Sequence, residues 1–279
     1  MTMLYRGYDR AALDAQYDNR ARVPEHPRDL ERWAARSAEV RAAFSCDVDL
    51  AYGEDARQRL DFFPAPQRDA PVLLYIHGGY WQALDKSYAS HVAPPFIAAG
   101  IAVAVMSYRL APAHRLTDIV ADARQAALWL TLQGRDLGID SARLHAAGHS
   151  AGGHLAACLL SDGLVKGACG ISGLYDLEPI RLCYLNGGLR LDVAEAQALS
   201  PIHTPPSETR SMLLAVGARE SPEFHRQQAD YVAALRAARR PVIAMTLEGR
   251  HHFDIVDSFC DPQSPLFEGM LRQILAPIF

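Results

Sequence analysis

The chain has 279 residues, of which 49% are hydrophobic, and its formal net charge is only −4. A chain of this length fits one α/β domain, and so large an apolar share leaves no room for extensive disorder. Basic and acidic residues are interspersed, which excludes the basic stripe of a nucleic-acid-binding surface.

The cysteines and residues 1–10 indicate in which cellular compartment the protein is expected. The cysteines occur singly, without a Cys-x-x-Cys pair, which argues against a zinc or redox site and favours reduced core thiols. Residues 1–10 are polar and have no apolar stretch typical of a signal peptide. No segment is apolar for long enough to span a membrane. We therefore expect a cytoplasmic protein. The five cysteines are Cys46, Cys158, Cys169, Cys183 and Cys260.

Residues 8–44 have the composition of a charged helical segment, with an irregular apolar stripe and breaks expected at Pro24 and Pro27. The segment precedes the first strand. We expect residues 1–279 to form a single domain, in which residues 1–44 are an N-terminal helical arm or cap.

From residue 46 on, the pattern changes to short strands separated by helices. Residues 46–52 alternate apolar and polar, as in a half-buried strand, and residues 59–63 can pair with them. Continuous apolar runs predict buried strands. These lie at residues 71–76, 101–107, 142–147, 167–172, 212–217 and 242–247, and helices are expected at 86–99, 117–134, 152–160 and 222–239. This alternation predicts an α/β fold, with a mostly parallel central sheet covered by helices on both faces.

A nucleophile motif follows the strand expected at 142–147. Gly148-His149-Ser150-Ala151-Gly152 matches G-x-S-x-G, in which a serine occupies a tight, strained turn between a strand and a helix. Side chains at the glycine positions would collide with the neighbouring chain. Because an apolar helix is expected directly after the motif, the context fits, and we predict Ser150 as a nucleophile.

A second motif, His77-Gly78-Gly79-Tyr80-Trp81, directly follows the strand expected at 71–76. It resembles the glycine-rich oxyanion loop of lipases and esterases with the α/β-hydrolase fold. By that resemblance, the backbone amides of Gly79, Tyr80 and Ala151 stabilise the oxyanion. We expect His77 and His149 to be structural, because nearness in sequence does not make a catalytic base.

In this fold the catalytic residues follow the order Ser, acid, His, so the base should lie after the last strand. His251 and His252 are found there, and both cannot be the base. The pattern His-Phe-Asp that begins at His252 favours this residue. Arg250 and His251 are then expected on the surface of the loop.

The acid should follow an earlier strand, and the strand at 212–217 is followed by Glu220 and Glu223. A carboxylate only has to accept the imidazole N–H and stabilise the imidazolium, so Glu220 can serve. Glu223 falls in the first turn of a helix, where a carboxylate is often only a helix-start residue. We favour Glu220 and keep Glu223 open.

Together these motifs resemble the kynurenine formamidases (arylformamidases) with the α/β-hydrolase fold, over about residues 45–257. The matching stretches are 75–82, 148–157, 171–180, 221–227 and 252–256. Stretches 171–180 and 221–227 are more particular to that family than 75–82 and 148–157. That family usually has an aspartate where this chain has Glu220.

The resemblance implies hydrolysis of N-formyl-L-kynurenine to kynurenine and formate, a step of tryptophan catabolism, without a metal or other cofactor. It assigns Ser150 as the nucleophile and His252 as the base. An aryl amine leaving group calls for aromatic contacts. We expect Trp81 and Tyr175 to bind substrate, with Tyr80 as a further candidate and Phe253 in the core.

Two other functions stay open. A carboxylesterase acting on small acyl or aryl esters would use the same residues, and a non-catalytic binding module with this fold is a more distant alternative. We expect a small-molecule substrate as partner, neither nucleic acid nor membrane, and leave a homodimer open. We also hypothesise that residues 1–44 cover the mouth of the site.

Overall fold

The computed structural model describes residues 3–208 and 210–276, so residues 1–2 of the expected arm lie outside the described part. The strands are β1 (Asp47–Ala51), β2 (Arg59–Phe63), β3 (Ala70–Ile76), β4 (Ala102–Met106), β5 (Ile139–His149), β6 (Gly167–Ile171), β7 (Ser211–Gly217) and β8 (Val242–Leu247). The helices are α1 (Arg10–Tyr17), α2 (Asn19–Arg22), α3 (His26–Ala43), α4 (Ala93–Ala98), α5 (Leu116–Leu137), α6 (Ala151–Ser161), α7 (Glu178–Leu182), α8 (Asn186–Leu189), α9 (Val193–Ala198), α10 (Pro222–Ala237), α11 (Ile255–Cys260) and α12 (Pro265–Leu275).

The strands form one eight-stranded sheet in the order β1-β2-β4-β3-β5-β6-β7-β8. The pairs β1–β2 and β2–β4 are antiparallel, and the remaining pairs are parallel. The expected hairpin at the start and the mostly parallel sheet are therefore confirmed. Because the carboxyl ends of the parallel strands meet at one edge, the loops after β3, β5, β6 and β7 gather there, where ligands bind in open α/β sheets.

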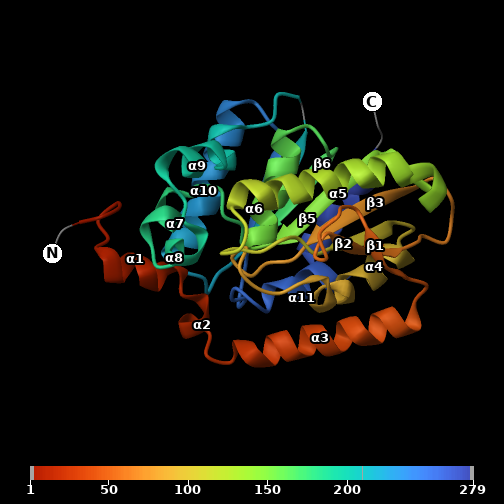
Figure 1. Cartoon of the computed structure of the whole chain (residues 1–279), viewed down its shortest axis with the longest axis horizontal. Coiled ribbons are helices and arrows are strands. Elements are labelled where there is room, and N and C mark those ends of the chain that lie inside the picture. The colour runs from red at the N-terminus through yellow and green to blue at the C-terminus, as the bar shows by residue number, and fades with distance from the viewer. Residues whose placement is uncertain (1–2, 209, 277–279) are drawn as a thin grey trace.

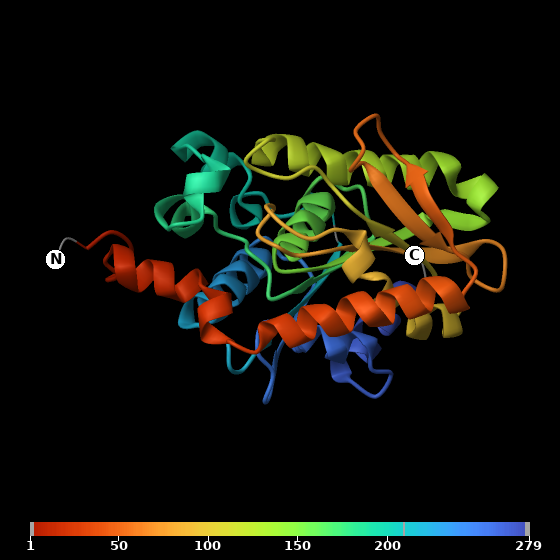
Figure 2. The ribbon, with the colours of Figure 1, turned by 60° about the horizontal axis from the view of Figure 1, so that its bottom comes forward.

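Helices cover both faces of this sheet (Figure 1). Alternate residues of β3 point to opposite sides: Leu74 packs in the cluster that includes residues of α5, α6 and α10, and Leu73 packs in the cluster that includes residues of α4, α11 and α12. Burial on both faces explains why β3 is a continuous apolar run. The arm follows the second face, with α3 running along α4 and α11 (Figure 2).

Several elements differ from the predicted ones. The helix expected at 86–99 consists of the 3₁₀ turns η1 (Lys86–Tyr88) and η2 (Ser90–Val92) followed by the short α4, whose first turn contains prolines. Pro27 does not break the arm but lies in the first turn of α3, where its missing N–H costs nothing. Strand β8 is mostly exposed because it forms the edge of the sheet.

The excursion between β6 and β7 was not predicted. It contains α7, α8, α9 and the 3₁₀ turn η3 (Pro201–His203), and most of these helices are only four to six residues long. Helices this short show too few turns for a periodic pattern to stand out. Among the described residues, no helix combines the length and the apolar character needed to cross a membrane.

Candidate active site

Ser150 lies in the sharp turn between β5 and α6, with φ of 55° and ψ of −117°. A non-glycine residue with positive φ is strained and tends to occur at functional sites. The Ser150 N–H donates to the Ile171 carbonyl at 2.8 Å, which fixes the turn against β6. The serine therefore occupies the conformation that the G-x-S-x-G motif predicts.

The two glycines of this motif are required by close packing. A Cβ atom on Gly148 would lie 2.2 Å from the Gly152 carbonyl oxygen, and one on Gly152 would lie 2.0 Å from the Ile76 carbonyl oxygen. Real Cβ atoms do not approach other atoms so closely. The turn can form only because both positions lack a side chain.

The loop after β3 lies against the turn that carries the serine. Gly79, Tyr80 and Trp81 all have positive φ, at 105°, 51° and 58°. A Cβ atom on Gly79 would lie 2.3 Å from the Ala83 carbonyl oxygen, so only glycine fits there. Within the described residues, no hydrogen bond takes up the N–H groups of Gly79 or Tyr80. Ala151 is the first residue of α6, where a backbone N–H has no partner inside the helix.

His252 pairs with Glu220 at the same edge of the sheet. His252 Nδ1 lies 2.7 Å from Glu220 Oε2, and both side chains are almost fully buried. The other carboxylate oxygen, Oε1, accepts from the Ser172 hydroxyl at 2.5 Å and from the Gly217 N–H at 2.7 Å. The loops after β6 and β7 thus hold the carboxylate from two sides and orient the imidazole.

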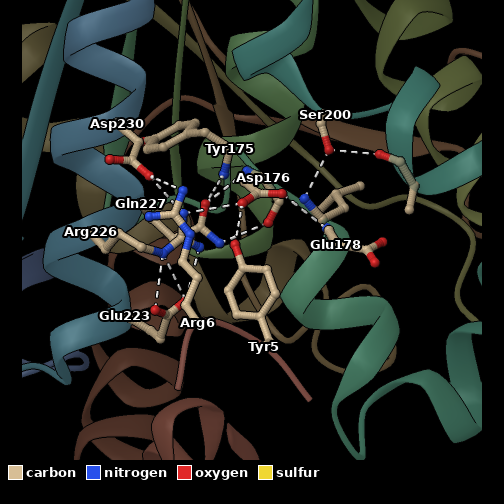
Figure 3. A network of polar contacts seen from close by, with 12 residues as sticks. Tyr5, Arg6, Tyr175, Asp176, Glu178, Ser200, Glu223, Arg226, Gln227 and Asp230 are labelled. Atoms are coloured by element: carbon tan, nitrogen blue, oxygen red, sulfur yellow. Dashed lines mark hydrogen bonds and ion pairs between the residues drawn. The ribbon is translucent and has the colours of Figure 1, made fainter. Parts of the chain in front are cut away.

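Glu223, the alternative acid, is engaged elsewhere. Its Oε2 accepts from the Tyr17 hydroxyl at 2.8 Å, and Arg226 donates to both of its oxygens. Arg226 also donates to Asp176 and Asp230, and Figure 3 shows this network around the start of α10. Glu223 therefore connects α10 to α1, and the structure brings Glu220 rather than Glu223 to the imidazole.

His251 is buried, which corrects the expectation that it lies on the loop surface. Its Nδ1 accepts from the N–H groups of Phe253 and Asp254, and Asp254 accepts in turn from the His251 N–H. The opposite ring nitrogen faces Asp29 of α3 at 3.9 Å. The arm covers this histidine, which shapes the turn that carries His252.

His77 and His149 make structural contacts. His77 donates from Nδ1 to the Gly78 carbonyl at 2.7 Å and stacks on Tyr108, and burial lowers the pKa of His77 to about 4. His149 Nε2 donates to the His252 carbonyl at 2.7 Å, and burial lowers the pKa of His149 well below its usual value. The neutral His149 thus ties the nucleophile turn to the loop of the base.

Ser150 and His252 line one cavity of 420 Å³, together with Gly79 and Tyr80. Its walls also carry aromatic and apolar side chains from four separate segments. These are Leu30, Trp33, Leu84, Tyr184, Leu185 and Phe253. A largely apolar cavity with a few convergent polar groups is the usual form of a small-molecule site.

The expected substrate contacts of Trp81 and Tyr175 need correction, because neither residue lines this cavity. Trp81 is fully buried and packs edge-on against His154, and Tyr175 stacks on Tyr231 under the excursion. Their positions after strand ends suggested contact, but both side chains pack in the core. Phe253 packs in the core, as expected, and also lines the cavity.

The arm reaches the cavity, as hypothesised for residues 1–44. The Tyr80 hydroxyl donates to the Tyr17 carbonyl at 2.8 Å and accepts from Asn19 Nδ2 at 2.9 Å. Asp14 accepts from the Tyr184 N–H at 2.7 Å, which joins the arm to the excursion. No local sequence pattern predicts these contacts, because they join segments far apart in the chain. Ser172 was also missed, although it directly follows β6 at the carboxyl edge of the sheet.

Among the described residues, no group of three or more His, Cys, Asp or Glu side chains is arranged to hold a metal ion. The residues gathered at the carboxyl edge instead combine a serine, a paired histidine and free backbone amides. This is the set that nucleophilic catalysis of acyl transfer requires.

Comparisons with known proteins agree with this chemistry. The family model described as BD-FAE matches residues 60–167. The chain is 31% identical to the kynurenine formamidase of Salmo salar over 81% of each chain, and 31% identical to that of Danio rerio over the same shares. The crystal structure of a proposed thioesterase from a Silicibacter species superposes with a TM-score of 0.81 at 30% identity, covering 95% of this chain and 99% of the other. The chain is therefore a hydrolase with the α/β-hydrolase fold and belongs to the kynurenine formamidase family.

Proposed function

We propose that this protein hydrolyses an aryl formamide, N-formyl-L-kynurenine, to kynurenine and formate through a formyl-enzyme. The observation that carries the proposal is the single cavity that contains Ser150, His252 and the Gly79–Tyr80 loop. The identity to kynurenine formamidases over most of the chain supports the formamide as substrate.

In the first half of the reaction, the Ser150 hydroxyl oxygen attacks the formyl carbon while His252 takes its proton. Glu220 stabilises the resulting imidazolium through the bond at Nδ1. The amides of Gly79, Tyr80 and Ala151 donate to the oxyanion of the tetrahedral intermediate. The C–N bond then breaks, the aryl amine takes the proton from His252, and Ser150 carries the formyl group as an ester.

In the second half, a water molecule attacks the formyl carbon and His252 takes a proton from the water. The ester bond to Ser150 breaks, the serine regains its proton from His252, and formate leaves. Because a formyl group is the smallest acyl group, the oxyanion side of the cavity needs little space. Tyr80, Tyr184 and Phe253 provide the aromatic wall for the aryl ring in place of Trp81 and Tyr175.

Ester hydrolysis is the second candidate, and the likeness at 30% identity to a proposed thioesterase favours it. Esters and formamides pass through the same kind of tetrahedral intermediate, so the pocket beyond the acyl group decides between them. The specificity constant kcat/KM should be measured for N-formyl-L-kynurenine, 4-nitrophenyl acetate and a short acyl thioester. We expect the formamide to have the highest value. Turnover of either ester without measurable kynurenine release would contradict the proposed function.

We also propose that the protein acts in the cytoplasm, as expected from its cysteines. These are free thiols in the structure, and burial raises the pKa of Cys158 and Cys260 to about 12, which keeps them protonated and unreactive. Cell fractionation of the native organism tests this location. The homodimer stays a prediction that sedimentation at several protein concentrations would test.

A further inference from the structure

The outer wall of the catalytic cavity is formed by three consecutive residues of the arm, Asp18, Asn19 and Arg20. Ser150 is only 2% exposed, whereas Arg20 is exposed, so these residues extend the cavity from the nucleophile toward solvent. A substrate with its formyl group at Ser150 would direct the far end of its leaving group toward this segment.

Asn19 has an unused acceptor although it is buried. The Tyr80 hydroxyl has one proton, which it donates to the Tyr17 carbonyl, so it must accept from the Asn19 amide. This fixes the orientation of the Asn19 side chain and leaves its Oδ1 without a hydrogen-bond partner among the described residues. Buried polar atoms normally have partners. Asn19 lines the cavity, but this oxygen is itself covered, so the charged neighbours Asp18 and Arg20 are the groups that a ligand can reach.

The neighbours of Asn19 carry opposite charges. Among the described residues that line the cavity, Asp18 and Arg20 are the carboxylate and the guanidinium. Neither forms an ion pair with another described residue, although Asp18 Oδ1 accepts from the Ala21 N–H as the N-cap of α2. Other arginines of the arm are paired, Arg10 with Asp14 and Arg32 with Asp29 and Asp257.

We propose that Asp18, Asn19 and Arg20 form a subsite for the α-amino-acid end of the leaving group. Arg20 pairs with the carboxylate, since a guanidinium binds carboxylates through two parallel hydrogen bonds. The ammonium donates to the Asp18 carboxylate, and Asn19 holds the segment against the Tyr80 hydroxyl. A zwitterionic amino acid carries both charges on one carbon, which matches opposite charges on adjacent residues. This inference rests on the proposed function and identifies what selects the amino-acid substrate.

Three formamides separate the contributions of the two charges. N-formyl-L-kynurenine carries both charges, 3-(2-formamidobenzoyl)propanoic acid carries the carboxylate alone, and 2′-formamidoacetophenone carries neither. The variants are Arg20→Gln and Asp18→Asn, and asparagine keeps the N-cap of α2. Arg22→Gln is the matched control, because Arg22 lies on the same short helix, is exposed and does not line the cavity.

Arg20→Gln should lower kcat/KM for the two carboxylates about tenfold more than for the acetophenone, mainly by raising KM. Asp18→Asn should lower kcat/KM for N-formyl-L-kynurenine more than for the deaminated acid. A fall that is equal for all three substrates, or no larger than that of Arg22→Gln, would overturn the subsite while leaving the proposed function intact. If the wild-type protein hydrolyses 4-nitrophenyl acetate but none of the formamides, the proposed function fails and the subsite with it.

Discussion

Ser172 donates its hydroxyl proton to Glu220 over 2.5 Å, from the turn that directly follows β6. This bond holds the carboxylate oxygen that does not face His252, and the Gly217 N–H holds the same oxygen at 2.7 Å. Ser172 has a φ of 51°, so its backbone is strained to place the hydroxyl there. A glutamate side chain is one methylene longer than that of an aspartate. The two bonds to Oε1 fix the position of its carboxylate, so that Oε2 faces the imidazole.

Replacing Ser172 should reveal its positioning role. Ser172→Ala removes one of the two donors to Glu220 Oε1, and a hydrogen bond to a charged group contributes about 1.5–3 kcal/mol. We expect kcat for N-formyl-L-kynurenine to fall about tenfold or more with little change in KM, because Ser172 does not line the cavity. Ser258→Ala, at a buried serine of α11, is the control. A rise in KM with unchanged kcat would argue against positioning.

Substitutions of the two candidate acids, Glu220 and Glu223, should have different effects on kcat and on stability. Glu220→Gln cannot stabilise the imidazolium and should lower kcat by about ten-thousandfold. Glu223→Gln should keep kcat in the wild-type order of magnitude, while urea unfolding shows a loss of about 1.5–3 kcal/mol, because Arg226 loses a buried charged partner. Equal losses of kcat in both variants would contradict the assignment of Glu220.

The oxyanion loop should not tolerate a side chain at Gly79. In Gly79→Ala the new Cβ atom meets the Ala83 carbonyl, and a φ of 105° is unfavourable for alanine. The loop must move, and loss of an oxyanion donor should lower kcat by about a hundredfold to a thousandfold. Gly187→Ala is the control, since a Cβ atom there has open space. Equal kcat values in the two variants would show that this loop is not the oxyanion hole.

Buried neutral histidines should make the protein sensitive to acid. Burial lowers the pKa of His154 to about 4, whereas an unfolded histidine has a pKa of about 6.5. Between these values the unfolded chain binds the proton and the folded chain does not, so stability is complete above about pH 6.5 and falls as the pH drops toward 4.

His154→Gln removes one such group while an amide can still donate to the Leu199 carbonyl. The free energy of unfolding should then fall less steeply with decreasing pH, by about 1.4 kcal/mol per pH unit in that window. Urea unfolding at a series of pH values measures both slopes. Parallel curves for the wild type and the variant would contradict a neutral buried His154.

Local patterns predicted much of this fold. The continuous apolar strands were predictable because both faces of the sheet are covered. The strained turn at Ser150 was predictable because its close packing requires glycine at positions 148 and 152. The expected place of the catalytic acid, after β7, reduced the candidates to Glu220 and Glu223. The contact of Glu220 with His252 decides between them, and it joins loops that follow different strands.

The walls of the cavity were not predictable in the same way. Trp81 and Tyr175 follow strand ends, but both side chains pack in the core. Tyr184 lines the cavity from an excursion whose helices are too short to show periodicity. The contact of Asn19 with Tyr80 joins residues 61 positions apart. No spacing rule predicts such a contact, because it depends on how the arm crosses the finished domain.

The central claim is that Ser150 is the nucleophile for the formamide. The most direct measurement is kcat of Ser150→Ala with N-formyl-L-kynurenine, with circular dichroism and thermal unfolding to show that the fold is retained. We predict a loss of about a thousandfold or more, leaving only the catalysis that the oxyanion amides and substrate binding supply. A folded Ser150→Ala protein with kcat close to that of the wild type would contradict the account.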